Sequence, residues 1–166
     1  EEFLKLIKEL NGDWKERIDD LDVFWFDWNE EHKGRKYLMH LLNIVKNHFD
    51  LSSAIGYETW IRMNTRPRDW HRDHDDRLEM TTGELKYPIC TTVYYPYVDE
   101  NVKDGRLCFE NGTIILPKTN RMAFFGPDIY HNVERFKGER LSILLNPWNE
   151  PLCQTPCHDP WRRYMV

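Results

Sequence analysis

The sequence lacks any apolar run long enough to cross a membrane, and its first residues, Glu1-Glu2-Phe3-Leu4-Lys5, lack the pattern of a signal peptide. It also lacks an excess of positive charge, because 23 Lys and Arg stand against 28 Asp and Glu, for a net charge of −5. A surface of this kind does not attract nucleic acid or an anionic membrane. We therefore expect a cytoplasmic protein with a small-molecule or peptidyl substrate, and neither nucleic acid nor membrane as a partner.

The sequence has four cysteines in 166 residues. Cys90 and Cys108 fall in expected strands, where small buried thiols are common, so we expect a reducing environment. The tail carries Cys153, Cys157 and His158, which are residue types that bind zinc, but no clear fourth ligand accompanies them. Ordinary thiols are the favoured interpretation.

Length and composition fit one domain over residues 1–166, with 40% hydrophobic residues and many aromatic ones to fill a core. Apolar residues at helical spacing predict helices over residues 2–10 and 30–49, within an N-terminal helical support over residues 1–56. From Tyr57 onward the pattern changes to short strands separated by turns, which predicts a core over residues 57–148 and an extended tail over residues 149–166. The expected fold is mainly β with flanking helices (α+β): a distorted, cupin-like jelly roll, or double-stranded β-helix, with the N-terminal helices packed outside.

A short segment around position 71 has the composition of a metal site. Alternate residues of an extended strand face the same side, so His71 and Asp73 present an imidazole and a carboxylate in one direction while Arg72 turns away. A third ligand, His131, would come from a distant strand folded alongside. Two histidines and one carboxylate form the set that leaves positions open on Fe(II) for substrate and oxygen.

The same spacing occurs a second time, because His74 and Asp76 form another His-x-Asp pair three residues later. We favour His71 and Asp73, since Trp70 and the preceding strand pattern place His71 nearer a strand end. A solvated patch of charged side chains is the alternative for this run.

Nine residues after His131, Arg140 and Ser142 open an apolar strand and share one of its faces. A planar guanidinium binds a carboxylate through two parallel hydrogen bonds, and a hydroxyl can add a third. Fe(II) with one carboxylate ligand is a positive site, and dianionic 2-oxoglutarate together with the Arg140 cation brings the total charge to about zero. A buried arginine without such a partner would be costly.

On these residues the chain resembles the Fe(II)- and 2-oxoglutarate-dependent dioxygenases, particularly the prolyl hydroxylase-like branch. The resemblance covers roughly residues 57–148. It is carried by His71-Arg72-Asp73, Pro88-Ile89-Cys90-Thr91-Thr92-Val93-Tyr94-Tyr95, Asp104-Gly105-Arg106-Leu107, Ile115-Leu116-Pro117, Asn120-Arg121-Met122-Ala123-Phe124-Phe125, His131 and Arg140-Leu141-Ser142.

The resemblance implies roles for these positions. His71, Asp73 and His131 would hold iron, and Arg140, with Ser142 and Tyr95, would hold the distal carboxylate of the cosubstrate 2-oxoglutarate. The implied reaction uses O2, with ascorbate as a stimulating reductant, and hydroxylates a C–H bond with release of succinate and CO2. No catalytic residue beyond the metal ligands is needed.

Two departures narrow the resemblance. No second arginine follows Ser142 in its strand, where Asn146 and Pro147 stand instead, which disfavours the nucleic-acid demethylase branch. Asp73 occupies the position where related halogenases carry a small residue, which favours hydroxylation.

Candidate substrate contacts surround the metal motif. Trp60, Arg62 and Asn64 share one face of the strand before it, and Trp70 and Arg72 flank its first ligand. Packing for the tryptophans and solvation for the arginines are equally good interpretations.

Two other functional classes fit parts of the pattern. One is a cupin-like metal-binding protein that does not use 2-oxoglutarate, against which Arg140 and Ser142 argue. The other is a noncatalytic peptide-binding module whose Trp and Arg residues dock a partner.

Overall fold

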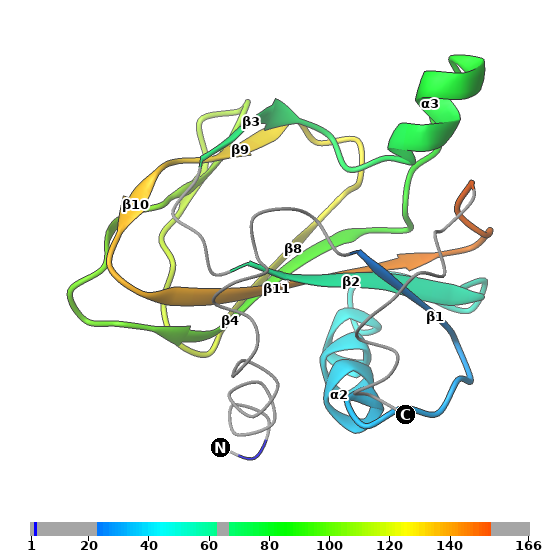
Figure 1. Cartoon of the computed structure of the whole chain (residues 1–166), viewed down its shortest axis with the longest axis horizontal. Helices are drawn as coiled ribbons and strands as arrows, with labels where there is room; N and C mark the ends of the chain where they lie inside the picture. Colours follow the sequence, from blue (N-terminus) through cyan, green and yellow to red (C-terminus); the bar gives the residue numbers. More distant parts are fainter. Residues whose placement is uncertain (1, 3–22, 63–66, 154–166) are drawn as a thin grey trace.

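The computed structural model describes residue 2 and residues 23–62 and 67–153 of the chain. A five-stranded antiparallel sheet runs through its centre (Figure 1). In spatial order its strands are β1 (Phe24–Asp27), β2 (Gly56–Arg62), β11 (Arg140–Trp148), β4 (Thr91–Val98) and β8 (Arg121–Phe125).

A second, four-stranded antiparallel sheet faces the first (Figure 1). Its strands, in spatial order, are β3 (Arg68–His71), β9 (His131–Val133), β6 (Leu107–Phe109) and β7 (Ile114–Ile115). A short pair, β10 (Phe136–Lys137) with β5 (Lys103–Asp104), lies where the chain passes between the two sheets. Two facing antiparallel sheets with neighbours distant in sequence fit the jelly roll that the sequence predicted.

The central strand β11 separates two groups of buried side chains by simple alternation. Leu141, Ile143 and Leu145 point outward into a cluster that also contains helix α2. Arg140, Ser142 and Leu144 point inward and line a cavity between the sheets. Because successive side chains of a strand face opposite sides, one nine-residue strand supplies both the outer core and the interior site.

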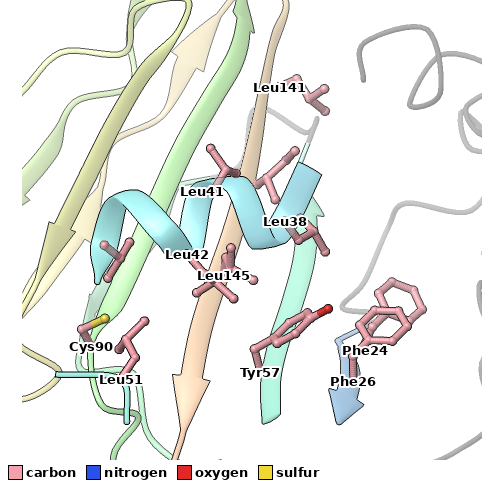
Figure 2. Close-up of a cluster of buried hydrophobic side chains, with 12 residues drawn as sticks. Phe24, Phe26, Leu38, Leu41, Leu42, Leu51, Tyr57, Cys90, Leu141 and Leu145 are labelled. Atoms are coloured by element: carbon pink, nitrogen blue, oxygen red, sulfur yellow. The ribbon is translucent and has the colours of Figure 1, made fainter. Parts of the chain in front are cut away.

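Helix α2 (Arg35–Val45) covers the outer face of the five-stranded sheet. Figure 2 shows its Leu38, Leu41 and Leu42 above Leu145 of β11, within a cluster of buried apolar side chains. Burial of each leucine side chain contributes about 1.5–3 kcal/mol. This packing positions β11 and therefore the polar residues on its other face.

Helix α2 is shorter than the expected helix over residues 30–49. Its beginning is delayed because Glu30 belongs to the turn after β1, where its side chain accepts a hydrogen bond of 3.2 Å from the Asp27 amide. The expected helix over residues 2–10 lies, apart from residue 2, outside the described residues.

Two elements differ from the sequence prediction. Strand β1 lies in the region expected to be helical, because its four residues are too few to show a clear alternation and only pairing with β2 reveals them. Helix α3 (Asp76–Thr82) lies in the charged run after the metal motif and has no buried residue. Its ends carry ordinary signals: the Asp75 side chain accepts from the Leu78 amide at 3.0 Å, and Gly83 adopts a φ of 76°.

Of the predicted tail, residues 149–153 are described. The Cys153 amide donates a hydrogen bond to Asp75, whereas Cys157 and His158 lie outside the described residues. Among the described residues, none of the helices has the length and apolar character needed to span a membrane.

Candidate functional site

Three candidate metal ligands converge at one end of the interior. His71, the last residue of β3, lies directly opposite His131, the first residue of β9, and their ring centroids are 4.3 Å apart. Asp73 follows β3 by two residues, and its Oδ1 lies 3.5 Å from His71 Nε2. One ligand atom from each of the three residues falls within 4.8 Å of the others. This spacing allows a single ion to contact all three.

Backbone carbonyls orient both histidines. Nδ1 of His71 lies 2.7 Å from the carbonyl oxygen of Asp69, and Nδ1 of His131 lies 3.0 Å from that of Ile129. Because a carbonyl oxygen only accepts, each Nδ1 carries the proton, and each Nε2 keeps its lone pair for a metal. The two rings therefore have the tautomer that a divalent cation requires.

The ionisation of the buried ligands favours metal binding as well. Burial lowers the pKa of His131, so its imidazole stays neutral near pH 7. Burial opposes the charge of Asp73, but the neighbouring His71 and His131 side chains outweigh it and lower the Asp73 pKa below its usual value. Neutral imidazole and ionised carboxylate are the forms that bind Fe(II).

Behind Asp73 lies a polar pair that the sequence analysis missed as part of the site. The Asn146 side-chain amide is 3.4 Å from Asp73 Oδ2 and 3.2 Å from Glu58 Oε1, so it donates to both carboxyl groups. Burial, followed by the charge of Asp73, raises the pKa of Glu58 to about 8. Glu58 is thus mostly uncharged at neutral pH and adds little repulsion to Asp73. The available signal was alternation, because Asn146 lies on the same inward face of β11 as Arg140 and Ser142.

This arrangement gives a first prediction. Replacing Asn146 with leucine should weaken Mn(II) binding about 10- to 100-fold, because outer partners of a metal ligand hold it in its binding orientation. Isothermal titration of the metal-free protein measures the change. Thr92→Val is the matched control, because it removes another buried hydrogen bond to β11, from the Thr92 hydroxyl to the Leu145 carbonyl. Equal metal affinity in Asn146→Leu and Thr92→Val would contradict the role assigned to Asn146.

The alternative pair, His74 and Asp76, lies elsewhere. His74 Nε2 is 3.3 Å from Asp76 Oδ1 and 2.7 Å from Glu79 Oε2, and both acids are exposed. Neither His74 nor Asp76 lines the interior cavity, whereas His71, Asp73 and His131 do. The structure thus brings the first His-x-Asp pair, and not the second, together with His131.

Arg140 is buried, lines the same cavity and has hydrogen-bond donors that are not all paired within the described residues. Its Nη1 donates to the Gly105 carbonyl at 2.5 Å, and its guanidinium carbon lies 4.0 Å from the Phe136 ring centroid and 5.6 Å from that of Tyr95. Arg140 Nε and Tyr95 Oη are buried without a hydrogen-bond partner among the described residues. A buried donor left unmatched costs about 1–3 kcal/mol, and more when it is charged. A bound anion would satisfy these donors.

Ser142, the third predicted contact for 2-oxoglutarate, is buried beside Arg140 on the same cavity. Its hydroxyl donates to the backbone carbonyl of Arg62 at 3.4 Å, across the pairing of β11 with β2. This long hydrogen bond leaves the hydroxyl oxygen able to accept or to reorient toward a ligand.

Gly105 is a second residue that sequence reasoning did not place in the site. It has a φ of 73°, and a Cβ there would lie 2.7 Å from Arg140 Nη1 and 2.8 Å from Phe136 Cβ. Only glycine combines this backbone conformation with so close an approach. Its carbonyl can therefore orient the Arg140 guanidinium toward the cavity.

The predicted substrate contacts divide into two groups. Trp60 and Arg62 line the cavity, and Asn64 lies outside the described residues. Trp70 and Arg72 do not line it. Trp70 is half exposed and stacks on Tyr130 at 5.7 Å, while Arg72 Nε donates to the Asp128 carbonyl at 2.8 Å. The reason is alternation, which directs positions 70 and 72 away from the side of His71 and Asp73.

The cavity has an additional cation that the sequence analysis did not include. Arg68, at the start of β3, lines it together with His71. The pairing of β3 with β9 shifts register between Arg68 and His71. Such an irregularity changes the direction of a side chain, which strict alternation cannot predict. The full lining is Trp60, Arg62, Arg68, His71, Asp73, Val93, Tyr95, Leu107, His131, Val133, Arg140, Ser142 and Leu144.

Comparisons with known proteins bear on the fold. No family model and no curated protein matches the chain. A prolyl-4-hydroxylase from Pseudomonas putida matches with a TM-score of 0.55 and 18% identity, covering 94% of this chain and 82% of that one. A prolyl hydroxylase from Trichoplax adhaerens, solved with a hypoxia inducible factor peptide fragment, matches with a TM-score of 0.54 and 17% identity, covering 89% and 77%.

A third match is the viral collagen prolyl hydroxylase of Paramecium Bursaria Chlorella virus-1, solved as a 2OG complex. Its TM-score is 0.51 and its identity 17%, covering 88% of this chain and 90% of that one. Likeness at these identities establishes a shared fold. The resemblance to the prolyl hydroxylase-like branch is confirmed at the level of the fold.

Proposed function

We propose that this protein is an Fe(II)- and 2-oxoglutarate-dependent dioxygenase that hydroxylates a C–H bond of an amino-acid-like, peptidyl or small-molecule substrate. The observation that carries the proposal is the juxtaposition of two sets of groups on one cavity. His71, Asp73 and His131 direct metal-binding atoms into it, and Arg140 adds a buried guanidinium with unmatched donors. A diacid that chelates the metal at one end and reaches the guanidinium at the other satisfies both.

The bound cofactors would supply the oxidation: 2-oxoglutarate, O2 and R–H become succinate, CO2 and R–OH. The chain itself would hold and orient the reactants. His71, Asp73 and His131 would hold Fe(II), and Arg140, with Tyr95 and Ser142 beside it, would hold the distal carboxylate of 2-oxoglutarate. The apolar side chains of the lining, among them Val93 and Leu107, would exclude water and position one C–H bond.

The charges of the described groups support this assignment. Asp73 and the two neutral imidazoles leave Fe(II) with a net positive charge, and Arg140 adds another. Dianionic 2-oxoglutarate cancels both. A cupin-like protein that does not use 2-oxoglutarate would leave Arg140 buried without a counter-charge among the described residues, which is unfavourable.

The test is turnover by the purified protein supplied with Fe(II), ascorbate and 2-oxoglutarate. We expect slow succinate release even without substrate, and NMR detects the succinate. This release should stop when a chelator removes the metal. Titration of the Mn(II)-loaded protein with 2-oxoglutarate is the companion measurement. Metal binding without 2-oxoglutarate binding would favour the cupin-like alternative, and failure to bind any divalent metal would favour a noncatalytic peptide-binding module.

A further inference from the structure

The cavity carries more positive charge than the proposed cofactors use. Arg62, at the end of β2, and Arg68, at the start of β3, line it in addition to Arg140. Among the described residues that line it, Asp73 is the only acid. Fe(II), Asp73, Arg140 and 2-oxoglutarate together sum to about zero, so Arg68 adds positive charge that these groups do not balance. This count rests on the proposed function.

The two extra arginines approach the cavity from different sheets. Arg62 pairs with Ser142 in the five-stranded sheet, next to the Arg140 side of the cavity. Arg68 pairs with Val133 in the facing sheet, on the strand that ends in His71 (Figure 1). Arg68 and His131 also line the same cavity. A ligand group between them would therefore lie beside the metal ligands.

Arg68 differs from the structural arginines of this fold. Arg106 donates two hydrogen bonds to Glu134, at 2.5 and 2.7 Å, and Arg72 is held by the Asp128 carbonyl. Arg68 forms no ion pair with any acid in the described ranges 23–62 and 67–153, although it is only partly exposed. A cation lining a cavity without a partner suits an anionic ligand, since a charge-assisted hydrogen bond is about twice as strong as a neutral one.

The other side chains that line the cavity indicate which chemical groups accompany the anionic group of the ligand. Trp60, Leu107, Val133 and Leu144 provide apolar surface on the same cavity. We propose that the substrate carries a carboxylate that Arg68 binds next to the proposed metal ligands, while an apolar carbon of the same molecule faces the metal site. Substrates of this class are amino acids with a free carboxylate and peptides with an acidic side chain.

The test compares matched acids and amides. Protein loaded with Mn(II) and 2-oxoglutarate is titrated, by ligand-observed NMR, with N-acetyl amino acids and with the corresponding N-acetyl amino acid amides. A second arm uses peptides with an internal Asp or Glu and the same peptides with Asn or Gln. We expect the acids of at least one arm to bind about tenfold or more tightly than their neutral partners. The arm that responds distinguishes a free carboxylate from an acidic side chain.

Arg68→Gln should remove this preference while 2-oxoglutarate and Mn(II) bind as in the unmodified protein. Arg106→Gln is the matched control, because it removes an arginine that directly precedes β6 of the same sheet but pairs with Glu134 and does not line the cavity. It should keep the preference. Equal binding of acids and amides, binding of neither, or a preference that survives Arg68→Gln would overturn the inference. If the unmodified protein fails to bind 2-oxoglutarate, the proposed function is overturned instead.

Discussion

His131→Ala should abolish succinate release and weaken Mn(II) binding by more than about 100-fold, beyond the effect expected from losing an outer partner of a ligand. The expectation follows from geometry, because His131 faces His71 across the β3–β9 pairing and its Nε2 is left free by the Nδ1 contact with Ile129. Without it, two ligands from one short segment remain. Succinate detection and metal titration measure the two effects.

The matched control for this prediction is His74→Ala. His74 belongs to the second His-x-Asp pair and contacts Asp76 and Glu79 outside the cavity. It should keep both metal affinity and turnover. Succinate release at the native rate by His131→Ala would refute the proposed metal centre, and loss of activity in His74→Ala with retention in His131→Ala would assign the metal to the other pair. His131 also packs against the Phe125 ring, with the ring centroids 4.8 Å apart, so its replacement could destabilise the fold. Thermal unfolding of the metal-free variants distinguishes such a loss of stability from a loss of metal binding.

The second large effect should follow from Arg140→Gln. We expect the dissociation constant for 2-oxoglutarate to rise roughly 30-fold to several-thousand-fold, equivalent to about 2–5 kcal/mol, because one partner of a buried, hydrogen-bonded charge pair is lost. Mn(II) affinity should change little, because Arg140 is not among the metal-binding residues. Titration of the variant with Mn(II), and then of the Mn(II)-loaded variant with 2-oxoglutarate, measures the two affinities separately.

Two further variants sharpen the Arg140 prediction. Arg140→Lys keeps the charge but loses the planar fork of donors, so it should recover only part of the affinity. Arg121→Gln removes an arginine of the same sheet whose Nη1 donates to the Leu116 carbonyl outside the cavity, and it should bind 2-oxoglutarate normally. Unchanged 2-oxoglutarate affinity in Arg140→Gln would show that the distal carboxylate has a different anchor.

Alternation made part of the site predictable. The pairs at 71 and 73 and at 140 and 142 each face one side because a strand has a period of two, and the sequence contains enough turns to show where the strands begin and end. The same rule predicted that position 72 turns away. It failed at Arg68, where the register shift in the β3–β9 pairing changes the direction of the side chain.

Other parts of the site could not be predicted in this way, because they depend on residues distant in sequence. Asn146 and Glu58 become partners of Asp73 only when β2 and β11 pair, and Gly105 becomes necessary only where Arg140 approaches its backbone. Alternation places Asn146 on the face of Arg140 and Ser142, but no spacing in the sequence pairs Asn146 or Glu58 with Asp73, or Gly105 with Arg140. Their roles are set by contacts that chain folding creates.

The sequence by itself determined the mainly β class, the residue types of the proposed metal and carboxylate sites, and the face on which each short motif lies, since these follow from local periodicity and side-chain chemistry. The tertiary structure alone decided between two identically spaced His-x-Asp pairs, because only strand pairing across sixty residues brings His71, and not His74, opposite His131. It also decided which arginines reach the cavity, because burial and direction depend on packing between the sheets and not on neighbours in the chain.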